Sequence, residues 1–231
     1  MKRLIFNVAL ALAAVLGISS CGYDNMDEPE TTVTGNIQYN GQNLQLRGTS
    51  GAVCVELYQP GYALKAPISV YVDQDGRFSA KLFKGQYKLV TKDNNGPWVN
   101  SRDTIVVDVN GATNVDVPVT PYFLVSEATA TLNGNTVTAH FKIDRIVPEA
   151  VLQDVYLCFG HTMLCDAAQN DFRIDVSGTE LQMGDNTVTR TLTDAQMAKA
   201  NSIGYTKLVM RLGVKSSATS ECIYSPMIQL R

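Results

Sequence analysis

Short runs in which apolar and polar residues alternate are the feature that most limits what this chain can fold into. Alternation with a period of two places successive side chains on opposite faces of a β-strand. Gly, Asn, Asp and Pro, which favour turns, separate the runs. The first seven runs cover residues 32–40, 52–59, 68–73, 77–83, 86–92, 103–109 and 113–120. This spacing predicts a β-sandwich.

A second set of runs begins after "TPYF", residues 120–123, where Pro118 and Pro121 interrupt the pattern. Its members cover residues 126–132, 135–144, 151–162, 207–216 and 224–230. Residues 133–135, Asn-Gly-Asn, predict a hairpin turn. One helix is expected in 191–202, capped by Thr193 or Asp194 and followed by Gly204. The chain is therefore expected to be all-β, with two β-sandwich domains at 32–120 and 121–231.

The first twenty residues are typical of a signal peptide. Lys2 and Arg3 precede an apolar stretch at 4–17, which is shorter than the roughly 20 residues of a membrane span. The following "ISSC" resembles the lipobox of bacterial lipoproteins, and this resemblance implies cleavage before Cys21 and lipidation of Cys21. Ordinary secretion with a coincidental cysteine is the alternative.

Residues 21–31 form an acidic segment after that cysteine, with carboxylates at Asp24, Asp27, Glu28 and Glu30. Its composition is typical of a flexible tether. It also resembles the acidic surface-export signal of Bacteroidetes lipoproteins, which implies a lipid-anchored protein on the outer membrane, facing the cell exterior. A lipoprotein that faces the periplasm is the alternative.

Charge and cysteine content exclude several classes of function. The net charge is −3 and the 19 Lys and Arg residues are scattered, so no nucleic-acid partner is expected. Four further cysteines, Cys54, Cys158, Cys165 and Cys222, are expected to be mostly free thiols, with Cys158–Cys165 the preferred pair if one bridge forms. Cys158, His161 and Cys165 lack a convincing fourth zinc ligand unless the distant Cys222 supplies it. No metal is expected.

Catalysis is difficult to assemble from this sequence. The chain has two histidines, His140 and His161, and contains no G-x-S-x-G motif and no phosphate-binding loop. Asp73, Asp75, Asp93 and Asp103 lie near turns of the first domain and could meet, as a glycosidase requires. Asp is common in turns, however, and "DQDG" at 73–76 lacks the calcium ligands of an EF-hand loop. We expect no enzyme and no cofactor.

The tryptophan in "KDNNGPWVNSRDT", residues 92–104, is the strongest candidate for ligand recognition. Trp98 lies on a loop with Asn95, Asn100 and Arg102, and a rigid indole offers a large contact area to a sugar ring. Tyr58 and Tyr62 are in another segment that could join it. These six residues form the candidate ligand site. The alternative is that Trp98 packs over the open end of the sandwich.

Three stretches carry a family resemblance: "SCGYDNMDEPE", "ISVYVDQDGRFSAKLF" and "NNGPWVNSRDT". The second is similar to the transthyretin-like, carboxypeptidase regulatory-like sandwich, and an Ig- or fibronectin-like sandwich is expected to follow it. Together they resemble the DUF3823 family of Bacteroidetes surface lipoproteins. Members accompany outer-membrane import systems for glycans, and no functional residues come with the resemblance.

These observations predict a noncatalytic lipoprotein of the outer-membrane surface that binds a polysaccharide or oligosaccharide beside a TonB-dependent importer. Its lipid would hold it at the membrane while its tether gives reach. A structural or protein-binding subunit of an outer-membrane complex, without affinity for sugars, is the alternative.

Overall fold

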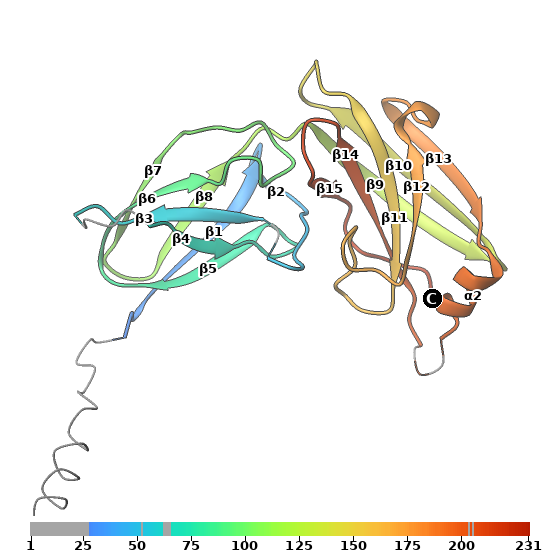
Figure 1. Ribbon diagram of the computed structural model, residues 1–231, viewed down its shortest axis with the longest axis horizontal. Coiled ribbons are helices and arrows are strands. Elements are labelled where there is room, and N and C mark those ends of the chain that lie inside the picture. Colours follow the sequence, from blue (N-terminus) through green and yellow to red (C-terminus); the bar gives the residue numbers. More distant parts are fainter. Residues whose placement is uncertain (1–27, 52, 62–65, 203, 205) are drawn as a thin grey trace, which may run out of the picture.

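Two β-sandwiches lie side by side and are joined by a short connection (Figure 1). The computed structural model describes residues 28–51, 53–61, 66–202, 204 and 206–231. Within them nearly all of the regular secondary structure is β-strand, with a single α-helix in the second sandwich. The prediction of an all-β chain with two sandwich domains and one short helix is confirmed.

The N-terminal sandwich packs two four-stranded sheets against each other. The first contains β1 (Thr31–Tyr39), β2 (Gln42–Asn43), β5 (Arg77–Leu82) and β8 (Thr113–Pro118). In this sheet β1 lies between β5, which is antiparallel to it, and β8, which is parallel to it. The second has the order β4 (Ile68–Tyr71), β3 (Cys54–Tyr58), β6 (Gly85–Thr91) and β7 (Ile105–Val109).

Alternation along these strands determines which side chains enter the core. In β1, Val33 and Ile37 are buried, and their register neighbours on β5 and β8 continue the same inner face. Tyr87 and Leu89 of β6 face them from the other sheet and are also buried. The intervening residues point outward, and this arrangement leaves a polar outer surface on both sheets.

The C-terminal sandwich is formed by a three-stranded and a five-stranded sheet. The first has the order β13 (Gly184–Thr191), β10 (Thr136–Arg145) and β9 (Phe123–Asn133). The second contains β12 (Phe172–Ser177), β11 (Leu152–Gly160), β14 (Val209–Ser216), β15 (Cys222–Tyr224) and β16 (Ile228–Gln229). A 3-10 turn, η2 (Gly178–Glu180), follows β12.

Local sequence signals determine the hairpin and the helix of this domain. Asn133 pairs with Thr136, so the predicted β9–β10 turn is a two-residue turn with Gly134 at φ +61°. Helix α2 (Asp194–Ala200) begins after the cap Thr193, whose hydroxyl accepts from the backbone N–H of Gln196. No helix in the described ranges is long and apolar enough to cross a membrane.

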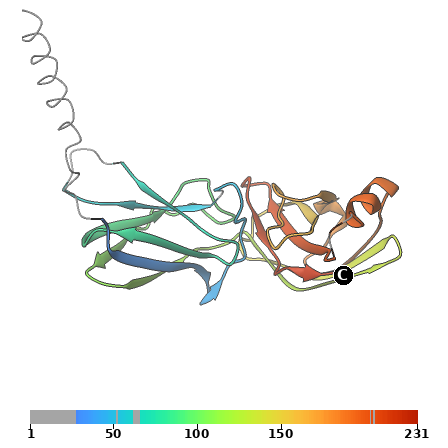
Figure 2. The ribbon, with the colours of Figure 1, turned by 90° about the horizontal axis from the view of Figure 1, so that it is seen from below.

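The two domains follow one another along the long axis of the molecule (Figure 2), and polar and apolar contacts join them. The centre of this interface is Arg211 of β14, which is 1% exposed and donates to the carbonyl oxygens of Leu46, 2.9 Å away, and Gln74, 3.1 Å away. Arg47 forms a two-pronged ion pair with Glu221, at 2.9 and 2.7 Å. Buried apolar side chains of both domains also belong to one contiguous cluster.

Candidate functional site

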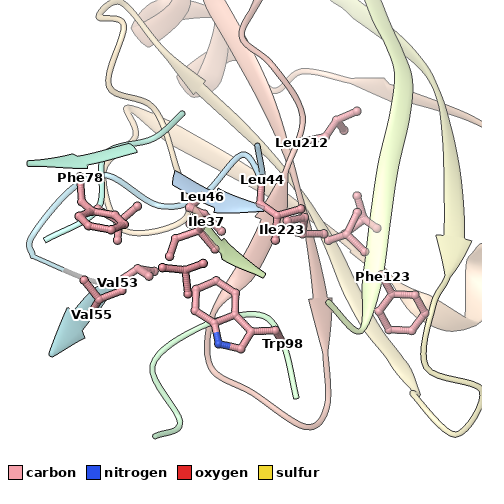
Figure 3. Close-up of a cluster of buried hydrophobic side chains, with 14 of the residues drawn as sticks. Ile37, Leu44, Leu46, Val53, Val55, Phe78, Trp98, Phe123, Leu212 and Ile223 are labelled. Carbon is pink, nitrogen blue, oxygen red and sulfur yellow. The ribbon is translucent and has the colours of Figure 1, made fainter. Parts of the chain in front are cut away.

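The indole of Trp98 is buried at the domain junction, with 2% of its surface exposed. Trp98 bridges to Pro121, and Val99 N–H donates to the carbonyl of Thr120 at 2.9 Å, so the loop turns the ring inward. The ring also covers Gly96, where a Cβ would lie 2.2 Å from the indole Cζ2. Figure 3 shows the ring in the core cluster. Because stacking needs an open ring face, the structure favours the packing interpretation of Trp98, and its assignment as a ligand platform is set aside.

Asn95 and Asn100 shape the loop around Trp98. The Asn95 side-chain oxygen accepts from the backbone N–H of Cys54 at 2.7 Å, which ties the loop to β3. Asn100 accepts from Asn94 N–H at 2.8 Å and donates to the Asn94 side chain at 2.7 Å. Asn94 has φ +55°, a conformation that asparagine tolerates better than most residues. Both predicted amides therefore contribute to loop geometry through these bonds.

Tyr58 and Arg102, two further predicted residues, come together in a groove on the outer face of the β4–β3–β6–β7 sheet. Its volume is about 450 Å³. The groove is lined by Glu56, Tyr58, Val90, Thr91, Lys92, Asp93, Ser101 and Arg102. Glu56 and Tyr58 share this face because they are two residues apart on β3, and Glu56 pairs with Val90 of β6. The loop after β6 supplies the other wall.

Hydrogen bonds and ion pairs fix the orientation of the polar groups in this groove. The Tyr58 hydroxyl donates to Glu56 Oε2 at 2.9 Å, and this bond raises the pKa of Tyr58. Arg102 Nη2 pairs with Asp93 Oδ2 at 3.1 Å on the exposed rim. The Lys92 ammonium has no hydrogen-bond partner among the described residues, so it is available to a bound molecule. The groove thus places one aromatic ring beside positively charged hydrogen-bond donors and negatively charged acceptors.

Sequence reasoning missed Glu56 and Lys92. The alternation in "CVELY" contained a signal for Glu56, because a residue two places before Tyr58 must share its face of the strand. Tyr62 and the lipidation candidate Cys21 both lie outside the described residues, as do residues 1–27 of the predicted signal peptide and tether.

The four cysteines in the described part of the chain are buried free thiols, as the sequence suggested. Cys158, Cys165 and Cys222 belong to one small cluster on the outer face of the five-stranded sheet, and no bridge joins Cys158 to Cys165. Burial raises the pKa of both Cys165 and Cys222 to about 12. A thiol with so high a pKa is a poor nucleophile and metal ligand at neutral pH.

His161 contacts residues outside the thiol cluster. Its Nδ1 lies 2.5 Å from Asp171 Oδ2, and its Nε2 lies 3.3 Å from the carbonyl of Ala200 at the end of α2. Across the described ranges, no three His, Cys, Asp or Glu side chains are placed to hold a metal ion. His140 is exposed on β10, where its ring bonds to Thr187 at 2.8 Å.

The acidic residues considered for catalysis are divided among separate places. Asp73 Oδ1 accepts from the N–H groups of Asp75, at 2.9 Å, and Arg77, at 2.8 Å, and so closes the β4–β5 turn. Asp93 pairs with Arg102 in the groove, while Asp103 Oδ2 accepts from Ser101 at 2.6 Å. The "DQDG" stretch is thus a structural turn.

Together, the fold and groove define an all-β protein of two fused sandwiches with a mixed-charge surface groove on the first. Family models match both parts: the DUF3823 protein of unknown function N-terminal domain at residues 31–120, and the domain of unknown function DUF3823_C at residues 123–229. The chain belongs to the DUF3823 family. This membership confirms the resemblance drawn from the sequence.

Solved structures of similar proteins agree with this assignment. A DUF3823 protein from Parabacteroides merdae is 39% identical, with a TM-score of 0.81, and the match covers 89% of this chain and 100% of that one. One from Bacteroides ovatus is 34% identical, with a TM-score of 0.74 and coverage of 87% and 100%. A third, from Bacteroides uniformis, is described as a "putative carbohydrate binding protein"; it is 17% identical, with a TM-score of 0.69 and coverage of 88% and 99%. No curated protein matches the sequence.

Proposed function

We propose that this protein is a noncatalytic, glycan-binding lipoprotein of the outer-membrane surface, and that the groove around Tyr58 is its binding site. The observation that carries the proposal is the composition of that groove: an aromatic ring with the Lys92 ammonium, the Arg102 guanidinium and the Glu56 carboxylate around it. A pyranose has an apolar C–H face and a polar rim. An aromatic face surrounded by charged hydrogen-bonding groups matches both.

Binding would use groups that are already in position. The bond from Tyr58 to Glu56 and the pair of Arg102 with Asp93 limit how these side chains can turn, which reduces the entropy lost on binding. Lys92 would donate to sugar hydroxyls. Lipid on Cys21 would hold the protein at the membrane, and the acidic segment after it would allow the domains to reach ligand.

The wider setting rests on the sequence and on the comparisons. The Bacteroides uniformis neighbour is described as binding carbohydrate, and its likeness extends over both domains. The predicted signal peptide and the acidic segment after it resemble those of an exported lipoprotein. We therefore include in the proposal that the protein works beside a TonB-dependent importer, to which it would supply captured polysaccharide.

A structural or protein-binding role in such a complex is the second candidate, and the burial of Trp98 favours it. With the indole in the core, the surface loses the aromatic that best suited a sugar. Val106, on the edge strand β7, is 54% exposed and would suit a protein partner better than a sugar. This candidate predicts that no polysaccharide binds.

Affinity electrophoresis would test the proposal with residues 22–231, which hold both domains. Gels would contain starch, xylan, galactomannan or mixed-linkage β-glucan. We expect retardation by at least one polysaccharide, with affinity lowered about tenfold or more by Tyr58→Ala, since tenfold corresponds to only about 1.4 kcal/mol. Tyr58→Phe keeps the ring and should keep most of the affinity.

Phe83→Ala is the matched control, because Phe83 is a 43% exposed aromatic outside the groove. Release of reducing ends would be measured in parallel, and none is expected. Absence of retardation by every polysaccharide would reject glycan binding in favour of the protein-binding role. Steady release of reducing ends would show that the protein is an enzyme.

A further inference from the structure

Tyr71, the last residue of β4, is the most exposed aromatic side chain of the described ranges, at 60%. Its ring is nevertheless packed against the backbone on one side. The ring lies against Gly51, where a Cβ would be 2.9 Å from the ring Cε1, and Gly51 has φ +56°. The absence of a side chain at position 51 therefore lets the ring rest on the backbone while most of its surface stays open.

Beside Tyr71 is a second hollow, of about 420 Å³, on the outer face of the β5–β1–β8 sheet. Three adjacent strands supply its polar side chains in register: Thr34 of β1 pairs with Ser79 of β5 and Asn114 of β8. Arg77 of β5 is next to Asn36 in the following row. Asp73 completes the rim close to Tyr71.

Hydrogen bonds within the sheet orient the amides of this hollow. The Thr34 hydroxyl donates to Asn114 Oδ1 at 3.1 Å, which leaves the Asn114 NH2 group without a partner among the described residues. Asn36 Nδ2 donates to Asp116 Oδ1 at 2.7 Å. The Arg77 guanidinium and the Tyr71 hydroxyl also have no hydrogen-bond or ion-pair partner in the described part of the chain.

We propose that this hollow is a second glycan site, in which Tyr71 stacks on a pyranose ring while Asn114 and Arg77 donate to its hydroxyls. Asp73 and Ser79 provide acceptors on the same rim. The ligand is a neutral sugar, because Arg77 is the only cation among the described residues that line the hollow and the Asp73 carboxylate offsets its charge. This inference rests on the proposed function and adds a site to it.

The second site changes how the protein holds a polysaccharide. The Tyr58 groove lies on the outer face of one sheet of the N-terminal sandwich, and the Tyr71 hollow lies on the outer face of the other. Two weak sites on opposite sheets can engage two chains, or two parts of one long chain, at once. Such paired engagement raises retention on a polymer well above that of either site alone.

Isothermal titration with hexasaccharides of any polysaccharide that retards the wild type would count the sites on residues 22–231. We expect two hexasaccharides per wild-type chain, one per chain for either Tyr71→Ala or Tyr58→Ala, and none for the double variant. Asn114→Ala should weaken the Tyr71 site, and Tyr71→Phe and Phe83→Ala should leave both sites intact. Because Tyr71 is mostly exposed, its truncation should leave the melting temperature nearly unchanged, and melting would check this.

The possible outcomes separate the two proposals. One site per wild-type chain, lost in Tyr58→Ala and unaffected by Tyr71→Ala, would overturn the second site and leave the proposed function standing. One site lost in Tyr71→Ala and unaffected by Tyr58→Ala would support the hollow and overturn the assignment of the groove. Binding of no polysaccharide by the wild type would overturn both.

Discussion

Trp98 lies on the loop between β6 and β7, and it contacts both the hydrophobic core and the boundary between the two domains. Its backbone bridges to Pro121 at the start of the second domain, and its ring belongs to the apolar cluster that both domains share. The carbonyl of the neighbouring Gly96 accepts from Thr219 of the second domain at 3.0 Å. A single loop therefore closes the end of the first sandwich and fixes its contact with the second.

Replacing Trp98 with Ala should destabilise the protein strongly. Truncation of a buried aromatic ring typically lowers the free energy of unfolding by about 3–5 kcal/mol, through lost burial and the cavity left behind. Urea unfolding followed by circular dichroism would measure this change, with Trp98→Phe as a milder variant. Stability equal to that of the wild type would mean that the ring is not packed in the core.

Residue roles were only partly predictable from the sequence. Composition placed Trp98 on a loop, but the direction of its ring depends on the bridge to Pro121, more than twenty positions along the chain. Tyr71 was predictable in principle: it stands between Val70 and Val72, which are both buried, so alternation points it outward. The partners that surround it come from three strands, and a local pattern does not contain that information.

At the scale of elements, the turn between β4 and β5 depends on one glycine. Gly76 has φ +74°, and a Cβ there would lie 2.4 Å from the carbonyl oxygen of Leu44. Its own carbonyl accepts from Ile37 N–H at 2.7 Å, so the turn is bonded to β1 as well as to its own strands. Both the backbone conformation and the close approach require glycine here.

Gly76→Ala should therefore destabilise the N-terminal sandwich by about 2 kcal/mol or more, because a left-handed conformation alone costs an L-residue about 1–2 kcal/mol. Gly111→Ala is a matched control, since no heavy atom lies within 4 Å of its Cβ position and its φ is not positive. Urea midpoints of the two variants would be compared. Equal midpoints would show that the turn adapts without cost.

Strands in which apolar and polar residues alternate regularly were predicted from the sequence, whereas two other strands were not. The runs at 77–83 and 86–92 correspond to β5 and β6, and the capping signal at Thr193 identified α2. β12 and β13 were not recognised, because β12 follows an irregular loop and the side of β13 that carries the buried Val188 also carries Asn186 and Arg190, so polarity contrasts weakly along it. Pairing order, such as the parallel contact of β1 with β8, lies beyond any local pattern.

At the scale of the whole molecule, the two sandwiches are bonded into one unit. Thr49 of the first domain donates to Asp166 of the second at 2.7 Å, and Tyr224 N–H donates to the carbonyl of Gln45 at 2.9 Å. Arg211 stacks over the Tyr224 ring, with 4.6 Å from its Cζ to the ring centroid. The two hydrogen bonds join residues some 120 to 180 positions apart, so the sequence alone did not indicate them.

Arg211→Met tests whether this interface makes the domains unfold together. The variant keeps an unbranched side chain but removes the donors to the carbonyls of Leu46 and Ser225, which then lack a partner among the described residues. The carbonyl of Gln74 loses one donor and keeps the N–H of Leu46 at 2.9 Å. We expect the free energy of unfolding to fall by about 3–5 kcal/mol, as for other broken buried charge networks, and two thermal transitions where the wild type shows one.

Arg190→Met is the control: Arg190 pairs with Glu180 at 2.6 Å on the surface, where such a pair contributes at most about 1 kcal/mol. Calorimetry would compare the three proteins, and similar melts for both variants would mean that the sandwiches are coupled by apolar packing, with Arg211 contributing little.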